Sequence, residues 1–288
     1  MVGKTMNTDP KTWEFPVLGG LISKGTTFNI VALRSLTADE QKKNEAYSQV
    51  AANARNRFKL FTILKGNYEQ WWSYTRSLLV PAENLDDDEM VELDRLLLNF
   101  QSAAKSVIDQ FRQEWIQQFR GKSEENQYDE YIKKLEAGCW SFAFFQDLRN
   151  FTQHCGLPVG NYARNGTPNS VSLQIEADPE WLLQRYKRWE KSGLRKEHGR
   201  LDLIKLTQEY FMCLQQNLGS FVANAFVPGM LEAHDFYAGL AKELVSQHPE
   251  AQFKIITRFN IVENRMDFQF KTPPANLLAW IGITVKQQ

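Results

Sequence analysis

The sequence has few cysteines and no long run of apolar residues. Its three cysteines, Cys139, Cys155 and Cys213, are odd in number and widely spaced, which argues against a disulfide framework and fits a reducing cytoplasm. No run of about 18 apolar residues occurs, so we expect no transmembrane helix and no membrane partner. The first residues lack the basic and then apolar pattern of a signal peptide. The sequence therefore predicts a cytoplasmic protein.

Net charge and the common cofactor and metal motifs are also missing. The chain has 34 Lys plus Arg and 34 Asp plus Glu, so any binding of RNA must come from a local patch of positive charge. There is no Walker loop, no G-x-G-x-x-G after a strand and no G-x-S-x-G elbow. His198, His234 and His248 have no cysteine or histidine at ligand spacing. We therefore expect neither a metal nor a cofactor.

Apolar residues recur at spacings of three and four over much of the first half, which predicts long helices. The capping box Thr37-Ala38-Asp39-Glu40 opens the first helix, and Pro81 ends it. A second helix begins within Asn84 to Asp88 and stops near Gly121. A third runs from about Ser123 to Gln153. Three long antiparallel helices joined by short links predict a bundle.

The second half and the ends of the chain mix helices with strands. The expected order from residue 155 is a loop (155–169), a strand (170–175), a helix opened by Asp178-Pro179, and two helices (about 200–225 and 230–247) separated by Pro228-Gly229. Residues 14–35 are predicted to form strands and turns, with Gly19-Gly20 after the first strand. Residues 252–271 are predicted to form a hairpin around Glu263-Asn264, ahead of a short apolar segment at 276–283.

The predicted fold class is therefore mainly α: a long-helix bundle with a small peripheral β-sheet, which the N-terminal and C-terminal segments form by pairing with each other. We expect a single domain over residues 1–288. Within it, residues 37–160 form the helical core, and residues 161–288 add further helices and the C-terminal hairpin.

The strongest candidate for a chemical site is Arg149-Asn150-Phe151-Thr152-Gln153-His154, at the end of the third predicted helix. An imidazole exchanges protons near neutral pH, and a guanidinium is a planar fork that matches phosphate oxygens. On a regular helix the arginine and the histidine lie about 140° apart. They converge if the helix ends near Gln153, as Gly156 and Pro158 indicate, or if two copies meet across a two-fold axis.

This stretch resembles the R-x(4–6)-H motif of the HEPN superfamily, and Asn150 fits the polar position after the arginine. The resemblance covers about residues 37–160. It implies a homodimer that brings two motifs into one cleft and cleaves RNA, without a metal, by attack of the ribose 2′-hydroxyl on the adjacent phosphate. His154 is then the general acid or base, Arg149 stabilises the phosphorane charge, and Asn150 orients the histidine or the substrate. The alternative is an arginine and a histidine that interact only with the helix dipole.

A second candidate is the most basic stretch of the chain, from Arg185 to Arg200. Its cations and its aromatic residues Tyr186 and Trp189 are typical of surfaces that hold a phosphate backbone and stack a base. The alternative is a solvated amphipathic helix whose aromatic side chains face the core. The predicted RNA contacts are Arg185, Lys187, Arg188, Trp189, Lys191, Arg195 and Lys196.

Two functions of different classes follow. The first is a HEPN-type endoribonuclease, with a role as a bacterial toxin or antiviral effector and an antitoxin or other regulatory partner. The second is a non-catalytic helical interaction module, in which the same motif holds a partner or a nucleotide.

Overall fold

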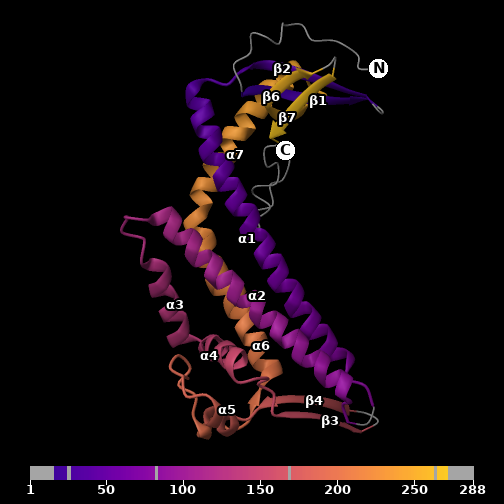
Figure 1. Cartoon of the computed structure of the whole chain (residues 1–288), viewed down its shortest axis with the longest axis vertical. Helices are drawn as coiled ribbons and strands as arrows, with labels where there is room; N and C mark the ends of the chain where they lie inside the picture. Colours follow the sequence, from indigo (N-terminus) through magenta and orange to yellow (C-terminus); the bar gives the residue numbers. More distant parts are fainter. Residues whose placement is uncertain (1–15, 25–26, 82–83, 168–169, 263–264, 272–288) are drawn as a thin grey trace. The chain divides into compact units, whose positions relative to one another are not determined.

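The computed structural model describes residues 16–24, 27–81, 84–167, 170–262 and 265–271. Over these residues the chain is mainly α-helical with a small peripheral sheet, as predicted (Figure 1). Its internal contacts divide it into two units. Unit 1 comprises Met1–Asn56 and Ala225–Gln288, and unit 2 comprises Arg57–Asn224. The single domain expected from the sequence stays a prediction.

The sheet of unit 1 is made by the two ends of the chain. Its strands, in the order β2-β1-β6-β7, are β2 (Thr27–Ser35), β1 (Val17–Lys24), β6 (Gln252–Val262) and β7 (Arg265–Lys271), and neighbours are antiparallel. Val17 lies opposite Ile256 in the β1–β6 register. The predicted pairing of the two ends and the predicted C-terminal hairpin are both confirmed. The turn at 263–264 and the apolar segment at 276–283 lie outside the described residues.

Two glycines let β1 approach its neighbours closely. A Cβ on Gly19 would lie 2.5 Å from the carbonyl oxygen of Val31, and one on Gly20 would lie 2.8 Å from that of Gln252. Both distances are shorter than any normal carbon–oxygen contact. A residue with a side chain would have no room at either position. Gly19 and Gly20 lie inside β1, not after the first strand as the sequence predicted.

The core of unit 1 lies between this sheet and two helices. Part of α1 (Ala38–Ser77) and part of α7 (Gly219–Gln247) belong to the unit. Buried apolar side chains from the sheet and from α7 form one cluster: Leu18, Leu36, Tyr237, Leu240, Leu244, Ala251 and Ile255. A second cluster packs α1 against α7: Ala51, Ala54, Met230 and Ala233.

The predicted break at Pro228-Gly229 is wrong, because α7 continues through Pro228. Proline cannot donate the backbone hydrogen bond that a helix interior requires. Just after it, Met230 and Ala233 are completely buried against α1. Burial of this face of α7 offsets the missing hydrogen bond. The local sequence around Pro228 does not show that burial, because it depends on packing against α1.

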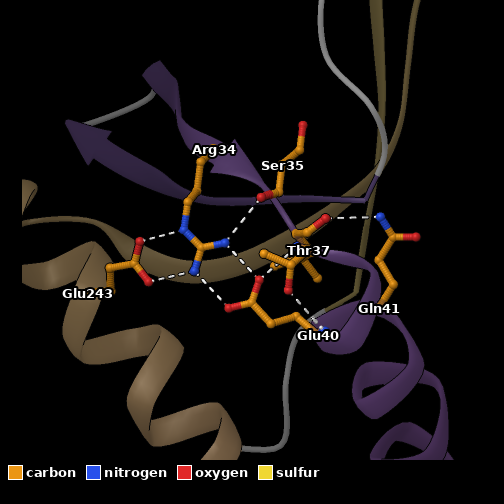
Figure 2. Close-up of polar contacts among 7 residues, drawn as sticks. Arg34, Ser35, Thr37, Glu40, Gln41 and Glu243 are labelled. Carbon is orange, nitrogen blue, oxygen red and sulfur yellow. Dashed lines mark hydrogen bonds and ion pairs between the residues drawn. The ribbon is translucent and has the colours of Figure 1, made fainter.

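One arginine connects three elements of unit 1 (Figure 2). Arg34, at the end of β2, donates from Nε and Nη2 to both carboxylate oxygens of Glu243 on α7, at 2.6 and 2.7 Å. It also donates from Nη1 and Nη2 to Glu40 at 2.7 and 2.8 Å. Glu40 completes the predicted capping box, since its backbone N–H donates to Thr37 Oγ1 at 3.3 Å and its carboxylate accepts from Thr37 N at 2.8 Å. This guanidinium therefore fixes the start of α1 and the end of α7 to the sheet.

Unit 2 contains the remaining helices and a second sheet. In chain order they are α2 (Asp87–Phe119), α3 (Gln127–Gly138), α4 (Trp140–His154), β3 (Asn161–Thr167), β4 (Ser170–Ala177), α5 (Pro179–Arg185), a 3₁₀ turn (Lys196–His198), β5 (Leu201–Asp202), α6 (Leu203–Met212) and a π-helical segment (Cys213–Leu218) that leads into α7. The second sheet has the order β3-β4-β5. Aromatic rings fill the core: Tyr210 stacks on Phe145 with centroids 4.7 Å apart and meets Phe100 edge-on at 5.8 Å.

Two expectations for this unit are wrong. The third predicted helix is two helices, because Cys139 has an extended backbone (φ −134°, ψ 99°) that separates α3 from α4. Residues 161–167, expected to be loop, form β3 and pair with β4. That hairpin is fixed by the buried side chain of Arg164, which donates to Glu89 at 2.7 Å. A long-range ion pair of this kind overrides the weak strand propensity of glycine and asparagine.

None of the helices in the described part of the chain combines the length and the apolar character that a membrane crossing requires.

We predict that Arg34→Met lowers the free energy of unfolding by about 1–2 kcal/mol, because two half-exposed carboxylates lose a shared bidentate donor. The hydrogen bond from Arg34 lowers the pKa of Glu40 to about 2, so this stabilisation is present above the usual glutamate pKa and is lost as pH falls towards 2. Urea unfolding at pH 7 and pH 3 measures both effects.

The matched control is Arg95→Met, which removes an exposed pair with Glu92 within one helix. It should change stability by less than about 0.5 kcal/mol. Equal losses for the two variants would contradict the role given to Arg34.

Candidate functional site

The candidate site lies on α4, which is buried over most of its length. Every residue from Ser141 to Leu148 is buried, and four of these eight are phenylalanine or leucine. A helix that is buried on all sides is a core element rather than a surface one. Exposure begins in its last turns: Arg149 and Asn150 are half-buried, and His154 is exposed.

The helix is regular through the whole motif. It includes His154 as its last residue, and Cys155 still donates its backbone N–H to Phe151 O at 2.8 Å. The Arg149 and His154 side chains therefore leave the axis about 140° apart. The convergence within one chain that would follow from a helix ending near Gln153 is not present.

Both motif side chains are free of carboxylate partners among the residues that the structure describes. The Thr152 hydroxyl donates to the carbonyl of Arg149 at 2.8 Å, which involves the backbone alone. An unpaired guanidinium and an exposed imidazole are both able to bind an anion from solvent.

A buried carboxylate on the same helix anchors a distant loop. Asp147 is 3% exposed, and one of its oxygens, Oδ2, accepts from Lys191 N at 3.1 Å, Ser192 N at 2.9 Å and Ser192 Oγ at 2.9 Å. Burial raises the pKa of Asp147, and these three donors oppose that rise. The partners of Asp147 are more than 40 residues away in the sequence, and no spacing rule indicates them.

The basic stretch 185–200 runs alongside α4 as a result. Cys155, just after the helix, donates its thiol to the carbonyl of Arg185 at 3.5 Å. At the other end of the helix, Trp140 Nε1 donates to the carbonyl of Ser192 at 2.9 Å, and its ring stacks on His198 at 5.1 Å. The stretch is not the amphipathic helix of the alternative interpretation: α5 ends at Arg185, and irregular chain follows, with a turn at 190–192 and the 3₁₀ turn at 196–198.

Trp189 belongs to the core. It is 5% exposed, it stacks on Phe144 at 5.9 Å, and its Nε1 donates to the carbonyl of Tyr186 at 2.9 Å. Its ring has no free face on which a base could stack. This corrects the aromatic part of the RNA-contact prediction and agrees with the alternative that the aromatic side chains face the core.

The basic residues of the stretch fall into two groups. Three cations face carboxylates: Lys191 pairs with Glu136, Lys196 with Glu180 at 2.8 Å, and Arg200 with Glu176 at 3.3 Å. The Arg185 guanidinium lies over the Trp181 ring at 4.7 Å. The others, Lys187, Arg188 and Arg195, are exposed and make no ion pair within the described part of the chain. Within the described part of the chain, these three and Arg185 are the cations of the stretch that no carboxylate offsets.

A metal centre finds no support among the described residues, where no three His, Cys, Asp or Glu side chains cluster as ligands. The acidic run at 86–89 caps α2, as its position indicates: Asp86 accepts from Glu89 N at 2.7 Å. Comparison of the chain with protein-family models, curated proteins and solved structures finds no match.

We predict that Asp147→Ala lowers the free energy of unfolding by about 2–4 kcal/mol, because it leaves buried donors of the loop at 191–192 unpaired. Trypsin should then cleave after Lys187 and Arg188 faster than in the wild type. Asp147→Asn keeps one acceptor oxygen and should lose less than half as much. Urea unfolding and the rate of tryptic cleavage measure these effects.

The control is Asp129→Ala, which removes a carboxylate from an exposed pair with Arg112. It should cost less than about 1 kcal/mol and leave the cleavage rate unchanged. An Asp147→Ala protein as stable and as resistant as this control would rule out the anchoring role.

Proposed function

We propose that the chain is a metal-independent endoribonuclease of HEPN type. The observation that carries the proposal is an unpaired arginine and an exposed histidine on the last turns of α4, where Cys155 contacts the segment that carries the exposed cations Lys187 and Arg188. A toxin or antiviral role, with a regulatory partner, would follow from uncontrolled cleavage of RNA.

The chemistry needs no group beyond the side chains present. His154 takes the proton of the ribose 2′-hydroxyl or gives one to the leaving oxygen, since an imidazole titrates near neutral pH. Arg149 donates to the phosphate oxygens whose negative charge grows in the transition state. Asn150, one residue along and half-buried, orients the histidine or the substrate.

The proposal includes a homodimer. Because the two side chains diverge within one chain, a complete site requires His154 of one copy and Arg149 of the partner subunit across a two-fold axis. Such a dimer would hold two equivalent sites in one cleft. Cleavage therefore depends on assembly of the dimer as well as on the chemistry of these side chains.

In an RNA cleavage assay in EDTA, we expect His154→Ala and Arg149→Ala each to lower the rate by about 10²–10⁴-fold, since each removes one half of the acid–base and charge-stabilising pair. His234→Ala, which changes a histidine of α7 in unit 1, is the control and should cleave like the wild type. Equal cleavage by wild type and His154→Ala would end the catalytic proposal.

Mixing the two inactive variants tests the dimer. If the subunits exchange freely, half the dimers contain both variants, and each of these has one intact composite site out of two, so about a quarter of wild-type activity returns. No recovery would contradict the shared site. No cleavage by the wild type on any RNA, with binding of a partner or nucleotide lost in both variants, would favour the interaction module instead.

The exposed cations predict where RNA lies. Lys187→Gln with Arg188→Gln should weaken RNA binding and lower the slope of log K against log salt concentration by about 1.4, from two lost phosphate contacts on a single strand. The control pair, Lys191→Gln with Lys196→Gln, removes cations that already face Glu136 and Glu180. It should change the slope much less. Equal changes for the two pairs would contradict this assignment.

A further inference from the structure

The break between α3 and α4 places a thiol where two helices meet. Cys139 is the C-cap of α3 and also the N-cap of α4, and its side chain is partly exposed. Its sulfur lies 3.2 Å from the Ser141 hydroxyl oxygen. Had residues 123–153 formed one continuous helix, this side chain would have been an ordinary helical residue.

A second cysteine lies opposite on the neighbouring helix. Phe142 and Phe145 of α4 both contact the ring of Tyr210 on α6, at 5.7 and 4.7 Å. Moving one turn along each helix leads from Phe142 back to Cys139 and from Tyr210 on to Cys213. The Cys213 side chain accordingly lies beside the Cys139 sulfur.

Cys213 lies at a specialised point of its helix. It begins the π-helical segment Cys213–Leu218, and such segments recur at functional sites. Within this segment, the side-chain amide of Asn217 donates to Cys213 Sγ at 3.7 Å. The backbone carbonyl of Asn217 accepts from the Tyr131 hydroxyl of α3 at 3.2 Å. Cys213 is itself buried, at 4% exposure.

We propose that Cys139 and Cys213 form a redox site, in which a hydroperoxide oxidises Cys139 and Cys213 then closes a disulfide with it. The proposal concerns unit 2 alone and does not rest on the ribonuclease assignment. The partly exposed cysteine meets the oxidant, and the buried one resolves the product.

Hydrogen peroxide oxidises the two thiols in two steps. The Cys139 thiolate attacks one oxygen of hydrogen peroxide, the O–O bond breaks, and the released hydroxide takes a proton to become water, leaving a sulfenic acid. The Cys213 sulfur then attacks the Cys139 sulfur, the S–S bond forms and the S–O bond breaks. The departing hydroxide leaves as water with the proton of Cys213. Two thiols lose two electrons, and one peroxide becomes two waters.

The pKa shifts of the two thiols agree with the roles that exposure assigns, in which Cys139 meets the oxidant and Cys213 forms the disulfide. The hydrogen bond from Cys213 lowers the pKa of Cys139 to about 5, with a smaller contribution from Ser141 and against the rise caused by burial. The backbone amide of Phe142 lowers the pKa of Cys139 in the same direction. The same contact and burial raise the pKa of Cys213. The thiolate is the reactive form, so Cys139 reacts first.

The third cysteine is a matched internal control. Cys155 is partly exposed like Cys139, but its thiol donates to the carbonyl of Arg185. No second cysteine faces it among the described residues. On these grounds Cys139 should react with peroxide at least about tenfold faster than Cys155.

The test treats the native full chain with hydrogen peroxide, blocks the remaining thiols in denaturant and maps tryptic peptides by mass spectrometry. We expect two of the three thiols to be lost and the peptide 135–149, which holds Cys139, to be linked to the peptide 206–242, which holds Cys213. Dithiothreitol should reverse the link. Intact thiols at 139 and 213, or a link that involves Cys155, would overturn the proposal.

Two variants separate the steps. Cys213→Ala should stop at the sulfenic acid on Cys139, which a 1,3-dione traps, whereas Cys139→Ser should leave Cys213 a free thiol under the same treatment. Trapping on Cys213 in the second variant at the wild-type rate would reverse the roles and contradict the assignment. If Cys213→Ala does not fold, the linked peptide in the wild type still decides the question, because it requires no variant.

Discussion

A single buried carboxylate organises the side of unit 2 where function is proposed. Asp147 accepts three hydrogen bonds from Lys191 and Ser192, so the loop that follows α5 must run along α4. A buried carboxylate without donors would be costly, and so would the unpaired amides of the loop. The same contact seats Trp189 on Phe144 and leaves Lys187 and Arg188 facing solvent. Together with the contacts of Trp140 and Cys155 at the two ends of α4, this interaction determines where the positive charge of the stretch lies.

Helix α4, which bears Asp147, is apolar in its middle and has a thiol at its start and two basic side chains in its last turns. Buried phenylalanines fix its position against Tyr210 and Trp189. At the start of α4, Cys139 has an extended backbone, so its thiol does not follow the helical arrangement of side chains. At the end, Arg149 and His154 emerge where exposure begins. Packing of this kind holds polar groups rigidly, which both a nuclease site and a thiol pair require. Because the helix is regular, Arg149 and His154 stay apart within one chain. The proposed nuclease site therefore requires a second copy of the chain.

Predictions from sequence succeeded where the cause is local or periodic. The capping box at Thr37 forms as expected, because side chain and backbone partners lie three residues apart, and α2 begins within Asn84 to Asp88. Alternating residues at both ends of the chain marked strands that pair in one sheet. Predictions failed where a distant contact outweighs propensity. Pro228 stays helical because its neighbours are buried against α1, and a Gly- and Asn-rich stretch becomes β3 through the buried Arg164–Glu89 pair.

The sequence by itself determined a mainly helical chain, a sheet made from its two ends, and the motif at Arg149 and His154, since short-range periodicity and composition set all of these. Tertiary structure alone decided that Trp189 is core, that Asp147 anchors the basic stretch, and that Cys139 faces Cys213. Each of these facts joins residues more than 40 positions apart. Such contacts depend on which faces pack together, and one sequence read along its length does not contain that information in local form.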